Sequence, residues 1–276
     1  MFPLRKSLVV LGLIAGCNSM ALKQEHGTVN AIQVPDAPPT PGKHSLRVSH
    51  FMFLSDFELD ARHPLFKELG EFPDQVYGEL KLPHLDTIVL VYLFENKRKY
   101  EDYMAARYPS LPNRRAFFVA QPRTIGGAED LLVYTYWGDR IQEDLRHELT
   151  HALLHGVLKD VPLWLDEGLA EYFETPPAAK GVNRQHLEQI KQLPFRPDLV
   201  RLERLESVQQ MAPAEYREAW AWVHLMLQGP PAIRQVLLDY LQALRTNPKP
   251  GSLSQRLANI SPRTGQMLVE HLARLP

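Results

Sequence analysis

The chain has 276 residues, with 31 basic and 32 acidic side chains and a formal net charge of −1. This near-neutral balance argues against a nucleic-acid-binding surface, because such domains are usually visibly basic. Hydrophobic residues make up 45% of the chain, enough for a sizeable core in one large domain or two smaller ones. The 23 prolines indicate linkers and sharp stops between elements.

Residues 1–17 have the layout of a secretory signal peptide. Arg5 and Lys6 precede a short apolar run at residues 8–15, which is too short to span a bilayer as a stable helix. The run ends in the sequence LIAGC, which resembles a bacterial lipobox, and its Cys17 is the only cysteine of the chain. We therefore expect Cys17 to carry acyl chains, palmitate among them, that anchor the protein to a membrane. The alternative is that Cys17 is an ordinary small apolar residue.

The segment after the cysteine is expected to be a tether. Residue 18 is asparagine rather than aspartate, and by resemblance to enterobacterial sorting this favours the outer membrane, facing the periplasm. Residues 18–45 are polar and rich in proline, so they cannot bury enough apolar surface to fold. The absence of further cysteines fits an exported protein without disulfides and removes thiolates from the possible metal ligands.

The next part of the chain, residues 46–140, predicts a small sheet with helices. β-branched and aromatic residues cluster in runs that predict strands at residues 46–55, 87–94, 116–120 and 131–137. The run at 87–94 is continuous, which is the pattern of a strand buried on both faces. Helices are expected at residues 65–80 and 96–107. This order of elements is typical of an α/β sheet subdomain.

The remainder of the chain, residues 141–276, is helical in pattern. Apolar positions recur at spacings of three and four residues. The expected helices are residues 141–158, 163–173, 183–192, 214–228, 232–245, 252–260 and 264–274. The predicted fold class is therefore α+β, with a small mixed sheet followed by an all-helical C-terminal part.

An H-E-x-x-H motif runs from His147 to His151 on the first of these helices. Two histidines four residues apart lie about 40° apart around a helix, so both rings can converge on one metal ion. Glu148 can reach a water on the metal rather than the metal itself. A third ligand must come from elsewhere, and after 15 intervening residues the next helix carries Glu167 and, four residues later, Glu171.

Two neighbouring features narrow the interpretation of this motif. Gly168, beside Glu167, removes a side chain where two helices would have to approach closely. Leu154 and Val157 occupy the positions at which the longer metzincin pattern requires a glycine and a histidine, so that class of zinc peptidase does not fit. His155 continues the series of histidines and is expected to be a neighbour of the site. The remaining histidines are expected to be ordinary.

Together, the segments HELTH and WLDEGLAEYF resemble the gluzincin metallopeptidases, the clan of thermolysin and the membrane alanyl aminopeptidases. They are most similar to its small bacterial peptidase-MA-like members. The resemblance implies a zincin-like fold and a Zn²⁺ cofactor held by His147, His151 and Glu167. It also implies that Glu171 accepts the free ring N–H of a ligand histidine and so fixes its tautomer.

The sequence differs from the gluzincin pattern in the length of one loop and in the residue at position 166. A further segment, around Tyr216, resembles the clan. The gap between His151 and Glu167 is a few residues shorter, so a tight connecting loop is expected. Asp166 replaces the usual asparagine and adds a charge. The segment YREAW resembles the aminopeptidase segment whose tyrosine stabilises the tetrahedral intermediate, which makes Tyr216 a candidate oxyanion donor. The alternative is a half-buried helix tyrosine.

These features predict a zinc-dependent metallopeptidase that hydrolyses a peptide or protein substrate. Glu148 would take the proton of a metal-activated water and return it to the leaving amine. Two alternatives remain. One is a non-catalytic lipoprotein that keeps the fold as a binding or assembly module, and the other is a zinc amidase acting on cell-wall peptides. The presence of Glu148 argues against the first, because a purely structural zinc site requires no base.

Overall fold

The computed structural model describes residues 38–84, 86–122 and 129–276. The expected signal peptide with Cys17 and most of the expected tether lie outside the described residues. Within the described ranges, none of the helices has the length and apolar character needed to cross a membrane.

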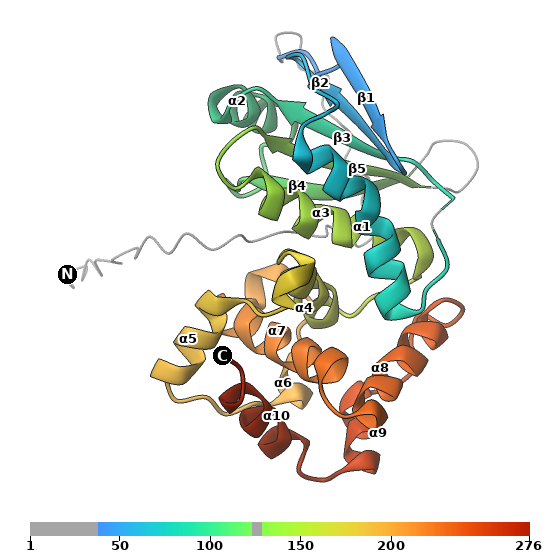
Figure 1. Cartoon of the computed structure of the whole chain (residues 1–276), viewed down its shortest axis with the longest axis vertical. Helices are drawn as coiled ribbons and strands as arrows, with labels where there is room; N and C mark the ends of the chain where they lie inside the picture. The colour runs from blue at the N-terminus through green and yellow to red at the C-terminus, as the bar shows by residue number, and fades with distance from the viewer. Residues whose placement is uncertain (1–37, 85, 123–128) are drawn as a thin grey trace, which may run out of the picture.

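The described part of the chain contains one five-stranded sheet. Its strands are β1 (His44–Val48), β2 (Phe51–Ser55), β3 (Val89–Phe94), β4 (Ala116–Pro122) and β5 (Glu129–Tyr136). Their order across the sheet is β1-β2-β3-β5-β4 (Figure 1). The inner strands β2, β3 and β5 are parallel, whereas the edge strands β1 and β4 run antiparallel to their neighbours. The predicted small mixed sheet in an α+β fold is confirmed.

Two expectations about the strands were wrong. The run at residues 46–55 is not one strand but a hairpin, in which Val48 pairs with Phe51 across a two-residue turn. Ser49 adopts a left-handed φ of 54° there, and this turn is invisible to the sequence rules because Ser-His is not a typical turn pair. The strand β3 is not buried on both faces. Its residues alternate between buried Val89 and Val91 and half-buried neighbours.

The helices follow the predicted pattern to within about two residues at each end, apart from α6, which was not predicted. They are α1 (Pro64–Leu80), α2 (Lys97–Arg107), α3 (Ile141–Val157), α4 (Leu163–Phe173), α5 (Arg184–Gln192), α6 (Leu199–Leu202), α7 (Pro213–Gln228), α8 (Pro231–Leu244), α9 (Leu253–Ile260) and α10 (Thr264–Ala273). Asn96 and Asn183 cap the N-termini of α2 and α5, where each side chain accepts a hydrogen bond from a backbone N–H of the first turn.

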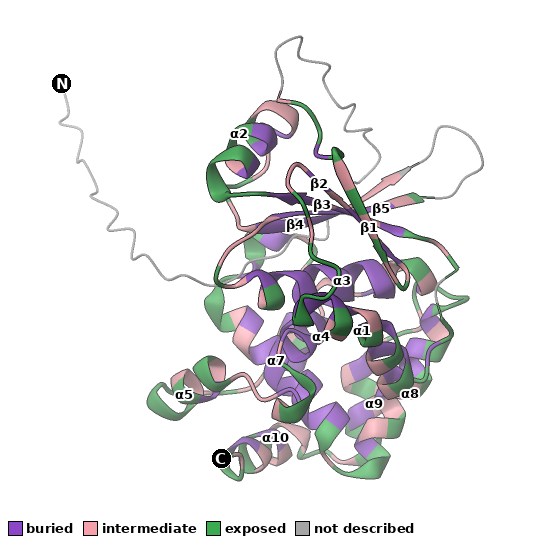
Figure 2. Ribbon diagram, turned by 45° about the horizontal axis from the view of Figure 1, so that its top comes forward, coloured by how far each residue is buried: buried purple, intermediate pink, exposed green. Residues whose placement is uncertain are grey.

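The helix α3 lies at the centre of the molecule. It packs against β4 and β5 on one side and against α4 on the other, and α4 in turn packs against α7 (Figure 1). The opposite face of the sheet contacts α2. Figure 2 shows that α3, α4 and α7 are largely buried. Every residue from Asp144 to Leu154 is buried, so the polar side chains of α3 are removed from water and need partners.

The helices α4 and α7 approach most closely at Gly168. A Cβ atom at this position would lie 2.7 Å from the carbonyl oxygen of Ala219 and 2.9 Å from Cγ2 of Val223. Both distances are shorter than normal contact, and the first involves backbone that cannot rotate away. The expectation that Gly168 permits a close helix approach is confirmed.

Replacing Gly168 with alanine is therefore expected to destabilise the protein by about 1–3 kcal/mol, the usual range for overpacking a core. Urea unfolding followed by circular dichroism measures the change. The matched control is Gly78→Ala in α1, where an added Cβ meets nothing within 4 Å. That variant is expected to be as stable as the parent or more stable by up to about 1 kcal/mol, because alanine favours helix. Equal stability of the Gly168→Ala variant and the parent would contradict the close approach.

Candidate metal centre

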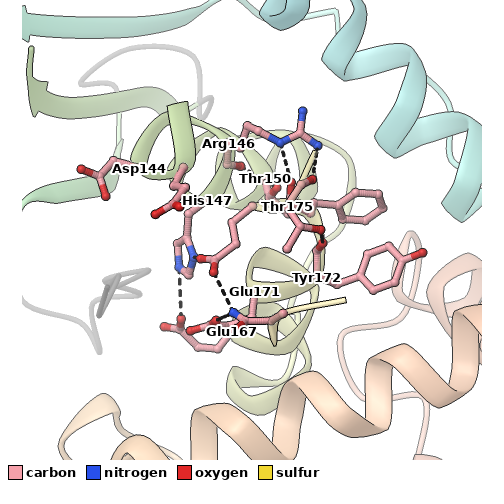
Figure 3. A network of polar contacts seen from close by, with 12 residues as sticks. Asp144, Arg146, His147, Thr150, Glu167, Glu171, Tyr172 and Thr175 are labelled. Atoms are coloured by element: carbon pink, nitrogen blue, oxygen red, sulfur yellow. Dashed lines mark hydrogen bonds and ion pairs between the residues drawn. The ribbon is translucent and has the colours of Figure 1, made fainter. Parts of the chain in front are cut away.

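Side chains of α3 and α4 converge on one point. His147, His151 and Glu167 each offer one ligand atom, and these three atoms lie within 4.8 Å of one another. The Nε2 atoms of His147 and His151 are 3.6 Å and 3.8 Å from Oε2 of Glu167. All three side chains are fully buried. Figure 3 shows the ring of His147 descending from α3 toward the acidic side chains of α4.

The facing atoms have no hydrogen-bond partner among the described residues. This holds for Nε2 of His147, Nε2 of His151 and both carboxylate oxygens of Glu167. A buried polar atom left without a partner costs about 1–3 kcal/mol, so four of them at one place require an explanation. Their separations are too long for hydrogen bonds. They are close to the distance of about 3.4 Å between two ligands of a tetrahedral ion with bonds of about 2.1 Å. Two imidazoles and one carboxylate therefore fit Zn²⁺.

The ring of His147 is oriented by Glu174. Its Nδ1 donates a hydrogen bond of 3.0 Å to Oε2 of Glu174, and Nδ2 of Asn183 donates one of 2.9 Å to the other oxygen of the same carboxylate. With its proton on Nδ1, the ring presents the lone pair of Nε2 toward Glu167. Burial and the charge of Glu171 raise the pKa of Glu174 to about 7, while His147 opposes the rise.

The expectation that Glu171 accepts the N–H of a ligand histidine was wrong. Its Oε2 instead accepts hydrogen bonds from Nε2 of His186 at 2.8 Å and from Nδ2 of Asn183 at 3.3 Å. The reason is the helical period, because Glu174, seven residues after Glu167, returns to within about 20° of the same side of α4. Glu174 therefore takes the position under His147. Glu167, Glu171 and Glu174 follow one another at spacings of four and three residues, and this spacing alone does not determine which of them contacts His147.

The second ligand histidine has its own acidic neighbour. Nδ1 of His151 lies 3.0 Å from Oδ2 of Asp166, and Nε2 of His155 donates a hydrogen bond of 2.9 Å to the same oxygen. Burial alone would raise the pKa of Asp166, but the two histidines outweigh burial and hold the pKa below its ordinary value. His155 thus lies beside the site, as expected. One oxygen of Asp166 therefore lies against both rings.

The metal-free site favours protons on its histidines. Burial alone would lower the pKa of His147, but the carboxylates of Glu167 and Glu174 outweigh burial and raise the pKa well above its ordinary value. The pKa of His151 is also raised, because Asp166 and Glu167 outweigh its burial. A protonated imidazole cannot bind a metal, so an entering ion must displace these protons.

The two candidate catalytic residues, Glu148 and Tyr216, lie near the candidate ligands. Glu148 is buried on α3, close enough to His147 for its charge to help raise the pKa of that ring. Tyr216, near the start of α7, is buried and its hydroxyl has no hydrogen-bond partner among the described residues. Burial and the charge of Glu167 raise the pKa of Tyr216, while Arg114 opposes the rise. The hydroxyl of Tyr216 therefore lies within the electrostatic reach of the candidate metal centre.

Arg146, which the sequence did not single out, ties α3 to the end of α4. It is fully buried and donates hydrogen bonds to the carbonyl oxygens of Phe173 at 2.9 Å and Thr175 at 2.8 Å (Figure 3). It also pairs with Glu68 of α1 at 2.8 Å. The two carbonyls flank Glu174, so this arginine holds the backbone from which Glu174 reaches His147.

Replacing Glu174 with glutamine is expected to weaken zinc binding about 10–100-fold, the usual effect of removing the group that orients a ligand histidine. Competition with a fluorescent zinc chelator measures the affinity. The matched control is Glu171→Gln, which makes the same substitution one turn away and is expected to change the affinity much less. A larger loss in the Glu171 variant would restore the original assignment of Glu171 as the partner of His147.

A family model matches part of the chain. Residues 143–250 match the model of a family described as "Protein of unknown function (DUF1570)". No curated protein matches the chain. Among solved structures, the chain is similar to the "M1 zinc metallopeptidase from Deinococcus radiodurans", with a TM-score of 0.42 and 19% sequence identity. That similarity covers 84% of this chain and 50% of the other, so this chain spans half the length of the protein it matches.

Proposed function

We propose that this protein is a zinc-dependent peptidase of the gluzincin type. The observation that carries the proposal is the convergence of four buried, unpartnered ligand atoms from His147, His151 and Glu167. The buried carboxylate of Glu148 directly follows the first ligand, and a metal site that served only the fold would not require it. The resemblance of HELTH and WLDEG to the gluzincin segments supports a zincin-like fold with the same assignment.

The side chains of the site fit peptide hydrolysis. A bound Zn²⁺ supplies Lewis acidity toward a carbonyl oxygen and toward water. Glu148 accepts the proton of the attacking water and delivers it to the nitrogen of the leaving amine. Tyr216, whose pKa is raised by burial, stays protonated at neutral pH. Its hydroxyl can therefore donate a hydrogen bond to the carbonyl oxygen as negative charge develops there.

Two acidic side chains orient the rings of the candidate ligand histidines. Glu174 fixes the ring of His147 by a hydrogen bond, and Asp166 lies against the ring of His151. Ligands oriented in this way keep the geometry of the site during the reaction, without a rearrangement in each turnover.

We further propose that the protein works in the bacterial cell envelope, anchored through lipid on Cys17 and held off the outer membrane by its proline-rich tether. The support for this is the LIAGC sequence, the asparagine that follows it and the composition of residues 18–45. A periplasmic location also favours cell-wall peptides as a second candidate substrate, because these are the amides that surround such an enzyme.

The test uses the Cys17→Ser chain, which cannot be acylated, purified and analysed for metal. We expect about one zinc per chain and chelator-sensitive cleavage of denatured proteins or short peptides. Cleavage of peptidoglycan fragments alone would identify the amidase. Bound zinc without turnover of any substrate would favour a non-catalytic module, and absence of zinc would overturn the proposal. In cells, acyl labelling of the parent but not of the Cys17→Ser chain tests the anchor.

A further inference from the structure

A pocket with a volume of about 520 Å³ lies between α2 and the segment that leads from α2 to β4. Its walls include Tyr100, Met104, Tyr108, Leu111, Arg114 and Phe117. The lining also includes the polar residues Glu101, Asp102 and Asn113, so the state of its charged and polar groups decides what can bind.

Two hydrogen-bond donors of this pocket lack partners among the described residues. Tyr100 is 1% exposed and its hydroxyl is unpartnered. Nη1 of Arg114 is also buried and unpartnered. A buried donor without an acceptor is unfavourable, and in a pocket an acceptor from a ligand can supply the missing bond. Nη1 of the Arg114 guanidinium and the hydroxyl of Tyr100 are therefore two donors that each lack a hydrogen-bond acceptor among the described residues.

The acidic residues of the same pocket are already balanced. Glu101 pairs with Lys97 at 3.5 Å and Asp102 pairs with Arg98 at 3.8 Å, both along the helix α2. None of the ion pairs found in the described part of the chain involves Arg114. Among the described residues that line the pocket, Arg114 is therefore the group that can offer a positive charge to a ligand.

The pocket adjoins the candidate metal centre. Arg115, the next residue after Arg114, pairs with Asp144 of α3 at 2.6 Å, one turn of helix before Glu148. Burial raises the pKa of Tyr100 and the charge of Glu148 adds to the rise. Arg114 lies close enough to Tyr216 to lower the pKa of that hydroxyl. One wall of the pocket therefore neighbours both the candidate base and the candidate oxyanion donor.

We propose that this pocket binds a carboxylate of the substrate through the guanidinium of Arg114 and the hydroxyl of Tyr100. A guanidinium donates two parallel hydrogen bonds to a carboxylate, and such charge-assisted bonds are stronger than neutral ones. The assignment rests on the proposed peptidase function and names its substrate class, an anionic peptide. The carboxylate has two possible sources, the C-terminus of a short peptide or an acidic side chain within a longer one.

The test measures peptide binding to the zinc-loaded Cys17→Ser chain that also carries Glu148→Gln, so that no peptide is cleaved. Three fluorescent peptides share one neutral core. The first has a free C-terminal carboxylate, the second a C-terminal amide, and the third a C-terminal amide with one internal glutamate. We expect one or both of the carboxylate peptides to bind about 10–100-fold more tightly than the neutral amide, as hydrogen bonds to charged groups predict. Whichever carboxylate peptide gains affinity identifies the source.

Substitution of Arg114 then assigns the gain to the pocket. Arg114→Ala is expected to abolish the preference for carboxylate without weakening the neutral amide, and Arg114→Lys to retain part of it. Arg62→Ala, which removes an equal charge from an exposed side chain outside the pocket, is expected to change nothing. Zinc content and thermal unfolding verify that each variant is folded.

The two proposals fail in different ways. If the peptides bind without preference for a carboxylate, or if the preference survives in Arg114→Ala, the pocket assignment is overturned and the peptidase proposal stands. If no peptide binds, including the neutral amide, both proposals are overturned.

Discussion

Replacing Glu148 with glutamine is expected to abolish peptide hydrolysis while zinc remains bound. Glutamine keeps the length and most of the volume of glutamate, but its amide cannot accept a proton at neutral pH. Loss of general base catalysis lowers kcat by about 10²–10⁴-fold. Zinc content is expected to be unchanged, because the three candidate ligands are His147, His151 and Glu167. Single-turnover cleavage of a peptide substrate and metal analysis of the same sample measure both quantities.

Glu143→Gln is the matched control for this experiment. It removes a carboxylate from the first turn of the same helix, where the side chain is 46% exposed and pairs with Arg140. Its activity is expected to stay within about twofold of the parent, because exposed ion pairs contribute little. Turnover retained in the Glu148 variant would remove Glu148 from the role of base.

The sequence predicts the elements that carry the site because their patterns are local. The helices α3 and α4 agree with their predicted ranges to within about one residue, since apolar spacing and the flanking proline and glycine residues set their ends. The same helical period places His147 and His151 on one side of α3. Local patterns do not determine which acidic side chain of α4 accepts a hydrogen bond from which histidine ring. That choice depends on how the two helices cross, and Glu171 was assigned wrongly for this reason.

Other residues of the site leave no local pattern at all. Arg146 acts on carbonyl oxygens 27 and 29 residues further along the chain, so nothing near Arg146 reveals its partners. Arg114 and Tyr100 belong to one pocket only because the segment between α2 and β4 folds back beside α2. The hairpin at Ser49 was missed because its turn pair is uncommon. In each case the deciding contact lies in the tertiary structure.

The buried acids of α4 divide into two kinds, and this division shapes what metal removal does. Glu171 and Glu174 have hydrogen-bond partners within the protein. Glu167 has none among the described residues, so without an ion its buried charge is opposed only by the nearby histidines. A metal ion is therefore the partner that Glu167 lacks in the described part of the chain, and metal binding is expected to stabilise the whole protein by mass action.

Replacing Glu167 with alanine is accordingly expected to lower the zinc content of the purified protein from about one ion per chain to almost none after dialysis. Two histidines alone leave the ion with too few protein ligands for a stable site. In the parent, added zinc is expected to raise the melting temperature and a chelator to lower it. In the Glu167→Ala variant both shifts should disappear, because the coupling between metal and folding is lost.

A second substitution at this position, Glu167→Gln, distinguishes a metal ligand from an acid that supports the fold. In the presence of chelator, Glu167→Gln is expected to melt only slightly below the parent, because the Glu167 carboxylate faces the rings of His147 and His151 at 3.6 Å and 3.8 Å without a hydrogen bond, and glutamine keeps the side-chain volume. Glu174→Gln, which breaks a satisfied hydrogen bond, is expected to melt lower under the same conditions. Differential scanning calorimetry of the three metal-free proteins measures this order. Unchanged zinc stoichiometry in Glu167→Ala, or a lower melting temperature for Glu167→Gln than for Glu174→Gln, would show that Glu167 supports the fold and that the third ligand lies elsewhere.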